Sequence, residues 1–327
     1  MELNDQPWKE DLVDEMDKIR SHPLSAPDLN ASALSQLNTQ ADGLFELCLS
    51  DPWPSLDVFY ELKKVQNIGG IELSWITENT VNYEEGLKII SDLPSVVYFW
   101  ARSIYLKSIH IPIAFPKLKL LYLKNPLLNQ VPKGIENCKE LLYCALSGDF
   151  SQENEAFEKF NGCDKLRCLD LRNTKMTRFP EALSHHLTLE ELDLVYNRIS
   201  DLPDSISNMR SLKELFLSNN LIQEIPESFI YFKCLEDLSL GSCRISEIPE
   251  FICQIKPLKY ISLHNNQIRD ISWDIRKLRN LPNLEVMNLM DNPLSDECKS
   301  RICQEFPIEK TPKILLDKND FKVWLDS

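Results

Sequence analysis

Apolar residues recur at a fixed interval through the second half of the chain. Leucines open successive copies of one pattern, each 23 residues after the last: Leu166, Leu189, Leu212, Leu235 and Leu258. Further apolar residues follow three and five residues after each opening leucine. In the first four copies a proline follows 14 residues after that leucine. A period in this range with this apolar skeleton predicts stacked units, each made of one strand and one return limb.

Alternation within one copy assigns the two sides of its strand. Leu215 and Leu217 lie two residues apart and point to the same side, which is the predicted core. Glu214 and Phe216 point to the other side, which is a predicted surface. The position eight residues after each opening leucine is expected to turn inward and bond to backbone groups; it holds Asn197, Asn220, Asn266, Thr174, Cys243, Asn292 and, in a copy opening at Leu118, Pro126.

The copies Leu189–Leu202 and Leu212–Ile225 match a known consensus at every skeleton position, and the chain therefore resembles the leucine-rich repeat family in its 23-residue form with Ile-Pro in the return limb. The resemblance covers Leu118 to Leu294. It implies an α/β solenoid, a horseshoe with a parallel β-sheet on its concave face. Prolines such as Pro203 suit a short helical or polyproline-like return.

The flanks of the repeats divide the chain into three predicted parts. These are a helical N-terminal cap or docking module at 1–66, a repeat solenoid at 67–294 that is irregular to 117 and regular from 118, and a C-terminal cap at 295–327. Apolar spacing predicts helices over Pro7–Arg20, Ser32–Leu49 and Ser55–Val65. We expect these helices to cover the first open edge of the sheet, with separate docking as the alternative.

Between the first helices and the regular repeats, two irregular units are predicted. Strands are expected at Ile71–Leu73 and Val97–Ala101, with a helical return at Asn82–Asp92 between them. The segment 147–165 lacks Ile-Pro and reads as an insertion at a convex or edge position, or as a contact loop. Ser295 is the expected N-cap of a closing helix that ends at Phe306, and the apolar tail should pack over the final repeat.

Charge and cysteine usage narrow the partners and the compartment. The net charge of −14 disfavours nucleic acid and anionic membrane and favours a partner protein with a basic surface patch. The 10 cysteines show no pairing pattern and read as reduced thiols. No apolar run is long enough for membrane insertion, and Met1–Arg20 does not resemble a secretory signal. We expect a cytoplasmic monomer; an effector that an intracellular bacterium delivers into host cytosol is the alternative.

The outward strand positions are the predicted partner-binding residues. They are Tyr122, Tyr143, Asp170, Arg172, Glu191, Asp193, Tyr196, Glu214, Phe216, Asp237, Tyr260, His264 and Asn288. Carboxylates on successive rungs repel one another unless a cation or a basic partner relieves them, and exposed aromatics often anchor interfaces. The prediction is a non-catalytic protein–protein interaction surface, acidic and studded with aromatic residues.

Catalytic, cofactor and metal sites are not predicted. The alternative is a Cys-dependent enzyme that uses Cys163 or Cys168 with His185. Against it, residues that are close in the sequence need not be close in the fold. The chain has no glycine-rich phosphate loop and no paired-cysteine zinc motif. A further alternative is an adaptor or effector whose N-terminal helices recruit a second component, for example a ubiquitin ligase.

Overall fold

A computed structural model describes most of the 327-residue chain. The described residues are 7–20, 23–25, 44–50, 54–74, 80, 83–102, 115–152, 156–307 and 311–317. They divide into two compact units, the first comprising Met1–Phe150 with Glu158–Leu166 and the second Ser151–Phe157 with Arg167–Ser327. Each unit is described by itself.

The first unit is built on a parallel sheet whose strands pair in sequence order. Its strands are β1 (Pro23–Ser25), β2 (Phe45–Leu49), β3 (Ile68–Ser74), β4 (Tyr98–Arg102), β5 (Leu120–Lys124) and β6 (Tyr143–Ser147). The returns include α3 (Leu56–Leu62), α4 (Tyr83–Ser91) and η2 (Ile135–Asn137), with η3 at Ala156–Gly162. The predicted irregular strands and the helical return between them are confirmed by β3, β4 and α4. Their apolar alternation is present even though the 23-residue spacing is not.

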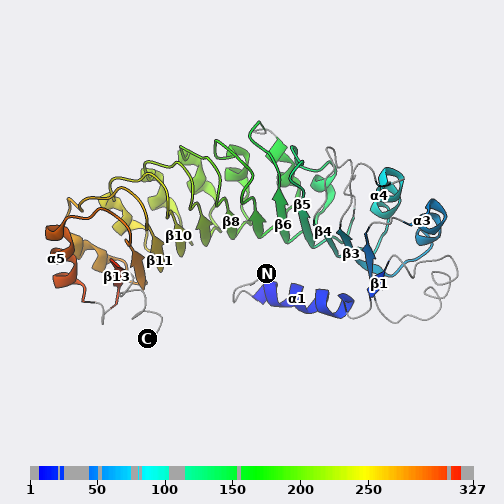
Figure 1. Cartoon of the computed structure of the whole chain (residues 1–327). Helices are drawn as coiled ribbons and strands as arrows, with labels where there is room; N and C mark the ends of the chain where they lie inside the picture. Colours follow the sequence, from blue (N-terminus) through cyan, green and yellow to red (C-terminus); the bar gives the residue numbers. More distant parts are fainter. Residues whose placement is uncertain are drawn as a thin grey trace. The chain divides into compact units, whose positions relative to one another are not determined.

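The second unit repeats the same arrangement with greater regularity. Its strands are β7 (Cys168–Asp170), β8 (Glu191–Asp193), β9 (Glu214–Phe216), β10 (Asp237–Ser239), β11 (Tyr260–Ser262), β12 (Val286–Asn288) and β13 (Lys313–Leu315). All neighbours are parallel, and one register places Leu192, Leu215 and Leu238 side by side, all fully buried. Within each unit the helical return limbs lie along one side of the strands, above them in the view of Figure 1. The predicted α/β solenoid of stacked strands and return limbs is confirmed.

Proline starts the short helices of the return limbs. Pro180, Pro203, Pro226 and Pro249 are the N-cap residues of η4 (Glu181–His185), η5 (Asp204–Asn208), η6 (Glu227–Tyr231) and η7 (Glu250–Gln254). The fixed φ of proline suits this position, and no ladder hydrogen bond is lost there. In η8 (Ile275–Asn280) the cap is Asp274, whose carboxylate accepts from the Arg276 N–H. The predicted short helical return is confirmed.

Inward-turned asparagine amides tie four of the repeats to the one before. Asn197 Nδ2 donates to the carbonyls of Leu171 (3.0 Å) and Leu194 (2.9 Å), and its Oδ1 accepts from the N–H groups of Thr174 (3.1 Å) and Met176 (3.0 Å). Asn220, Asn266 and Asn292 donate to the same two kinds of carbonyl. The amide thus closes backbone groups that the chain leaves open when it turns out of the strand.

The residue before this buried position adopts a left-handed backbone in each repeat of the second unit. The positive-φ residues at this place are Asn173, Tyr196, Asn219, Ser242, Asn265 and Asp291. Asn and Asp tolerate this region because their short polar side chains bond locally, whereas a bulky residue is strained there. Tyr196, at φ 58°, is the one aromatic residue in the series.

Three details differ from the sequence-based expectations. Phe45–Leu49 forms a strand, so the predicted helix Ser32–Leu49 is wrong at that end, because Leu47 and Leu49 are buried with period two; residues 32–43 lie outside the described residues. Asn125, and not Pro126, is buried after β5. The predicted insertion 147–165 places Phe150, Phe157 and Phe160 in the core, where they replace the Ile-Pro anchor.

The first helix packs on the sheet of its own unit. The predicted span is confirmed, because α1 covers Pro7–Arg20, and it buries Leu12, Met16 and Ile19 against β2 and β3. The Arg20 guanidinium carbon lies 5.3 Å from the ring centroid of Trp100 on β4, and Lys119 contacts Glu15 at 2.6 Å. The helix therefore lies across the outward side of β2 and β3.

The C-terminal end closes with a helix and one more strand. The helix α5 (Asp296–Glu305) begins after Ser295, whose Oγ accepts from the Cys298 N–H at 3.1 Å, so the predicted N-cap is confirmed. β13 pairs with β12 and sets Ile314 beside Met287. Residues 318–327, to which the predicted packing of the tail applies, lie outside the described residues. None of the described helices is long and apolar enough to cross a membrane.

We predict that Asn197→Ala lowers the free energy of unfolding by about 2–4 kcal/mol, because two carbonyls and two N–H groups lose a buried partner. Chemical denaturation followed by circular dichroism measures this change. The matched control is Asn208→Ala, which removes an exposed amide from the return limb of the same repeat. It should change stability by less than about 0.5 kcal/mol. Equal effects of the two substitutions would show that the amide ladder contributes nothing special.

Candidate binding site

The outward residues of the second unit's strands form one continuous face, which we call the strand face. Pairing aligns Glu191, Glu214, Asp237 and Tyr260 in one row and Asp193, Phe216, Ser239, Ser262 and Asn288 in the next. Leu192, Leu215 and Leu238 between these rows are fully buried. The strand assignment that placed the predicted binding residues outward is therefore correct for β8 to β12.

The acids at the first strands of this face are paired within the protein. Arg172 reaches Asp170 Oδ2 with Nε at 2.9 Å and Asp193 Oδ2 with Nη2 at 3.0 Å. Asp170 and Asp193 are only 5% and 6% exposed. Burial raises the pKa of Asp193 to about 6, against the opposing effect of the Val195 N–H. The prediction that these two carboxylates face a partner needs correction, since Arg172 already relieves their repulsion.

Further along the face, the carboxylates remain partly accessible. Glu191, Glu214 and Asp237 are partly buried. Burial, and then the charge of Glu214, raise the pKa of Asp237 to about 7. No side-chain hydrogen bond or ion pair to Asp237 is present among the described residues. A desolvated carboxylate without a partner costs stability whenever it is ionised.

A pocket of about 280 Å³ opens on the strand face around Asp237. Its apolar wall consists of Phe216, Tyr260, Val286 and Leu315, contributed by four different strands. Its polar groups are Asp237, Ser239, Ser262 and Asn288. Asn288 Oδ1 accepts from the Met290 N–H at 3.1 Å, which fixes the orientation of its amide. The pocket combines apolar area with hydrogen-bond acceptors, the usual composition of a site for one side chain or small group.

Two aromatic residues of the strand face are exposed. Tyr196 is 62% exposed at the end of β8, and Tyr260 is 37% exposed on β11, where its hydroxyl donates to Glu285 at 2.6 Å. Phe216 between them is partly buried and lines the pocket. An exposed tyrosine in a left-handed conformation contributes little burial and adds strain, so folding alone gives no reason for Tyr196.

His264 serves the packing of the strand face. Its Nδ1 lies 2.9 Å from Ser262 Oγ, and a Cβ added to Gly241 would lie 2.0 Å from the ring. Gly241 is thus required for the close approach of this ring. Ser262, which is bonded to His264, lines the pocket, and no sequence pattern indicated the role of the glycine.

The two predicted residues of the first unit have different surroundings. Tyr122 stacks on Trp100 with ring centroids 4.1 Å apart, and the Lys124 ammonium lies 5.2 Å from its ring centroid. Tyr143 is 5% exposed and offers no accessible surface, so its predicted role in binding needs correction. Alternation along the strand predicted that Tyr143 faces outward, but it contains no information about which residues cover that side chain.

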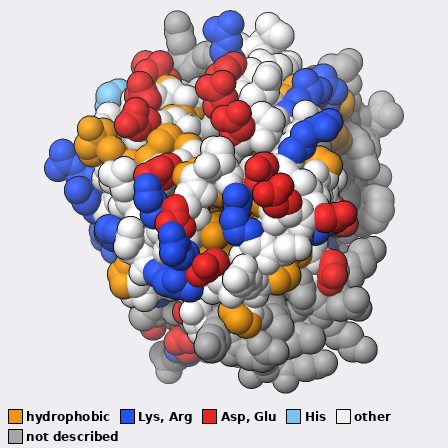
Figure 2. Space-filling view, turned by 90° about the vertical axis from the view of Figure 1, so that its left-hand side faces the viewer, with side chains coloured by type: hydrophobic (Ala, Val, Ile, Leu, Met, Phe, Trp, Pro, Cys, Tyr) orange, Lys and Arg blue, Asp and Glu red, His pale blue; other side chains and the backbone are white. Residues whose placement is uncertain are grey.

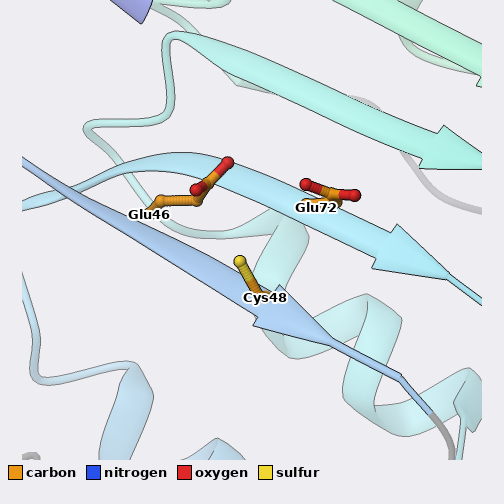
Figure 3. Close-up of side chains that lie close together, drawn as sticks. All are labelled: Glu46, Cys48 and Glu72. Carbon is orange, nitrogen blue, oxygen red and sulfur yellow. The ribbon is translucent and has the colours of Figure 1, made fainter. Parts of the chain in front are cut away.

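A cluster of possible metal ligands in the first unit was missed by the sequence reasoning. Glu46 and Cys48 on β2 face Glu72 on β3, with their ligand atoms within 4.8 Å of one another (Figure 3). Glu46 accepts from the Tyr98 hydroxyl at 2.5 Å, and Arg102 contacts Glu72 at 2.9 Å. Burial and then the two carboxylates raise the pKa of the Cys48 thiol to about 12, which disfavours the thiolate that a metal needs. Glu46 and Glu72 are thus paired with neighbouring side chains on the side of β2 and β3 that α1 covers.

The thiols of the Cys-dependent alternative are buried. Burial raises the pKa of Cys163 to about 12, and its Sγ donates to the Ile135 carbonyl at 3.2 Å. Cys168 is also buried, and all 10 cysteines are free. A buried, protonated thiol is a poor nucleophile. The geometry therefore gives the enzyme alternative no support at these residues.

The C-terminal end of the second unit carries charges of both signs. Figure 2 shows Lys and Arg side chains interspersed with Asp and Glu on this side. Ion pairs here include Arg279–Glu305 at 3.1 Å and Arg301–Asp270 at 2.9 Å. Such exposed pairs contribute little each, and they leave no large patch of one sign on the visible side.

Comparison with known proteins identifies the repeat. A family model described as leucine rich repeat matches residues 187–245. Among solved structures, a leucine-rich repeat protein of Leptospira interrogans is 23% identical with a TM-score of 0.68, over 87% of this chain and 68% of that one. An internalin from Listeria monocytogenes is 20% identical with a TM-score of 0.60, over 84% and 72%. No curated protein matches the sequence.

Two solved complexes are similar over a smaller share of their own chains. The plant peptide hormone receptor RGFR1 in complex with RGF2 is 19% identical with a TM-score of 0.55, and the match covers 84% of this chain and 48% of that one. The mouse RP105/MD-1 complex is 19% identical with a TM-score of 0.55, over 82% and 50%. This chain thus spans about half the length of these two matched chains. At such identities the likeness shows the fold alone.

We predict that Asp237→Asn raises the free energy of unfolding by about 1–2 kcal/mol at pH 8 and changes it little at pH 4. The folded state binds the Asp237 proton more tightly than the unfolded state, so between the ordinary pKa of 3.8 and about 7 its stability falls as pH rises. Asparagine cannot ionise and escapes this penalty. Denaturation curves at several pH values measure the difference.

The control for Asp237→Asn is Glu224→Gln, which removes one negative charge from an exposed side chain in the preceding repeat. It should leave stability within about 0.5 kcal/mol at both pH values. A destabilised Asp237→Asn protein at pH 8 would mean that the carboxylate has a stabilising partner after all.

Proposed function

We propose that this chain, a leucine-rich repeat protein, is a non-catalytic interaction protein that binds a partner protein through the strand face of its second unit. The partner would present a basic patch to the partly accessible carboxylates of this face. The supporting features are the accessible acids Glu191, Glu214 and Asp237 and the exposed rings of Tyr196 and Tyr260. Tyrosine and complementary charge together are the usual anchors of a protein interface.

Tyr196 is the observation that supports this proposal most. The same position in the other repeats holds Asn, Ser or Asp, which suit the left-handed backbone better. A 62% exposed ring gains little from packing, so its presence at a strained position is explained best by contact with another molecule.

The similar structures support a binding role by analogy. RGFR1 was solved with RGF2, and RP105 with MD-1, so proteins of this fold hold partners. The family model and the fold likewise favour an interaction scaffold over an enzyme. Cys163 is buried and its Sγ donates to the Ile135 carbonyl, which does not favour a nucleophilic role.

We further propose that the protein works in the cytoplasm as a monomer. The support is chemical, because 10 free cysteines, most of them buried among apolar side chains, suit a reducing compartment. The adaptor alternative is weakened by α1, which directs Leu12, Met16 and Ile19 into its own unit. Delivery into host cytosol as an effector would be compatible with the same thiols.

Reversing one accessible charge should weaken partner binding. We expect Glu214→Lys to lower the recovery of partner protein from cell extract about tenfold and to reduce the salt dependence of what remains, because a steering carboxylate is lost. Quantitative mass spectrometry of parallel pull-downs measures recovery. Asp193 is left unchanged because it is paired with Arg172, so its reversal would disturb the fold.

The control for Glu214→Lys is Glu224→Lys, which makes the same charge change at an exposed residue outside the strand. Its recovered proteins should match those of the unaltered chain. If both variants recover the same proteins in the same amounts, the partner does not bind on the strand face.

Replacing Tyr196 should separate stability from binding. We expect Tyr196→Asn to raise the free energy of unfolding by about 0.5–1 kcal/mol, because asparagine tolerates the positive φ. Recovery of the partner in the same pull-down should fall. Tyr231→Asn, at a ring 61% exposed on η6, is the control and should show neither change. A Tyr196→Asn protein that retains its partner would remove the main support for this surface.

A further inference from the structure

The pocket around Asp237 has features that select one kind of side chain. Its wall is made by the rings of Phe216 and Tyr260 and by the aliphatic groups of Val286 and Leu315. Its acceptors are the Asp237 carboxylate, two serine hydroxyls and the Asn288 amide oxygen. The side chains around it supply one negative charge, and Glu214 adds a second beside Asp237. A matching group must therefore be cationic, long enough to cross an apolar wall, and rich in donors.

We propose that this pocket holds a single arginine side chain of the partner protein, with its guanidinium paired to the Asp237 carboxylate. This proposal rests on the proposed function and adds the residue type that the strand face recognises. The aliphatic stem of the arginine would lie against Val286 and Leu315, and the planar group against the ring of Tyr260. Arginine fits better than lysine because its guanidinium is weakly hydrated, packs on aromatic faces and offers donors in a fixed plane.

The hydrogen-bond inventory agrees with this occupant. A guanidinium carries five N–H donors and no acceptor, and the polar groups of the pocket can accept. Asp237 contributes two oxygens without any partner among the described residues. Ser239 Oγ shares one hydrogen bond with Ser218 Oγ at 2.7 Å and retains a lone pair. An ammonium ion would use fewer of these acceptors and would lose more hydration on entering.

Charge compensation gives the pocket a reason to be filled. Asp237 faces Glu214 on β9 and Tyr260 on β11, and the Tyr260 hydroxyl is itself bound to Glu285. No cation of the described chain reaches the carboxylate, in contrast with Asp193, which has Arg172. A guanidinium from another molecule would pair with Asp237 as Arg172 pairs with Asp170 and Asp193. The cation would then come from the chain itself at β7 and β8 and from the partner at β10.

Binding should therefore depend on pH in a direction that can be stated. The pKa of Asp237 is raised to about 7 in the empty pocket, while arginine stays charged throughout. The affinity for arginine should rise about tenfold between pH 6 and pH 8 as the carboxylate loses its proton. In Asp237→Asn this rise should disappear.

The experiment compares two fluorescein-labelled peptides, hexa-arginine and hexa-lysine, which carry equal charge. Their binding to the full-length chain is measured by fluorescence anisotropy at about 0.15 M salt, where long-range attraction to the acidic protein is screened. We expect hexa-arginine to bind at least about fivefold more tightly than hexa-lysine. Asp237→Asn should weaken hexa-arginine binding about tenfold, and Tyr260→Ala about fivefold.

Matched controls use side chains outside the pocket. Glu224→Gln removes one charge and Tyr231→Ala removes one exposed ring, and each should change hexa-arginine binding by less than about twofold. Asp237→Asn is expected to fold at least as stably as the unaltered chain, so circular dichroism will separate lost binding from lost structure.

Three results would overturn the pocket proposal. Equal binding of the two peptides would show recognition of charge alone, and unaltered hexa-arginine binding by Asp237→Asn would place the contact elsewhere. A dimer of the chain that Asp237→Asn dissociates, seen by size-exclusion chromatography, would assign the pocket to a second copy. If Glu214→Lys still abolishes recovery of the partner while Asp237→Asn leaves peptide binding intact, the proposed function survives and the arginine pocket does not.

Discussion

Four repeats of the second unit depend on an inward-turned asparagine amide that bonds to the backbone of the repeat before it. Asn197, Asn220, Asn266 and Asn292 all donate to carbonyls that the strand turn leaves open. The bonds run between repeats as well as within them, so one repeat completes the hydrogen bonding of another. The regular register of β7 to β13 follows from this linkage together with the leucines that lie between the outward rows.

The same turn determines where strain and exposure coincide. To bring the amide inward, the preceding residue must adopt a positive φ, and its side chain then points to solvent. Most repeats use Asn, Ser or Asp there, which lowers the strain. Tyr196 has the same positive φ, which strains an aromatic residue, and its ring is exposed next to the strand face. Position in the repeat thus links a requirement of folding to a site suited to binding.

The two units treat the outward sides of their strands differently. In the first unit, α1 covers β2 and β3, and Arg20 lies over the rings of Tyr98 and Trp100. In the second unit, Arg172 neutralises Asp170 and Asp193, but Asp237 has no cation among the described residues. Desolvated charge without compensation is costly to folding. It is therefore at Asp237 that binding of a cation would add most.

The sequence by itself determined the repeat, its period, the buried leucines and asparagines, the return prolines and the Ser295 cap. These features depend on residues close in the chain, whose spacing fixes which side of a strand or turn they occupy. The tertiary structure alone decided that Asp193 is buried against Arg172, that Tyr143 is covered, that Phe45–Leu49 is a strand and that α1 lies across the sheet. It also decided that residues from β9 to β13 enclose one pocket. Those facts depend on which side chains meet across neighbouring repeats, and alternation along one strand carries no information about its neighbours' charge, length or covering segments.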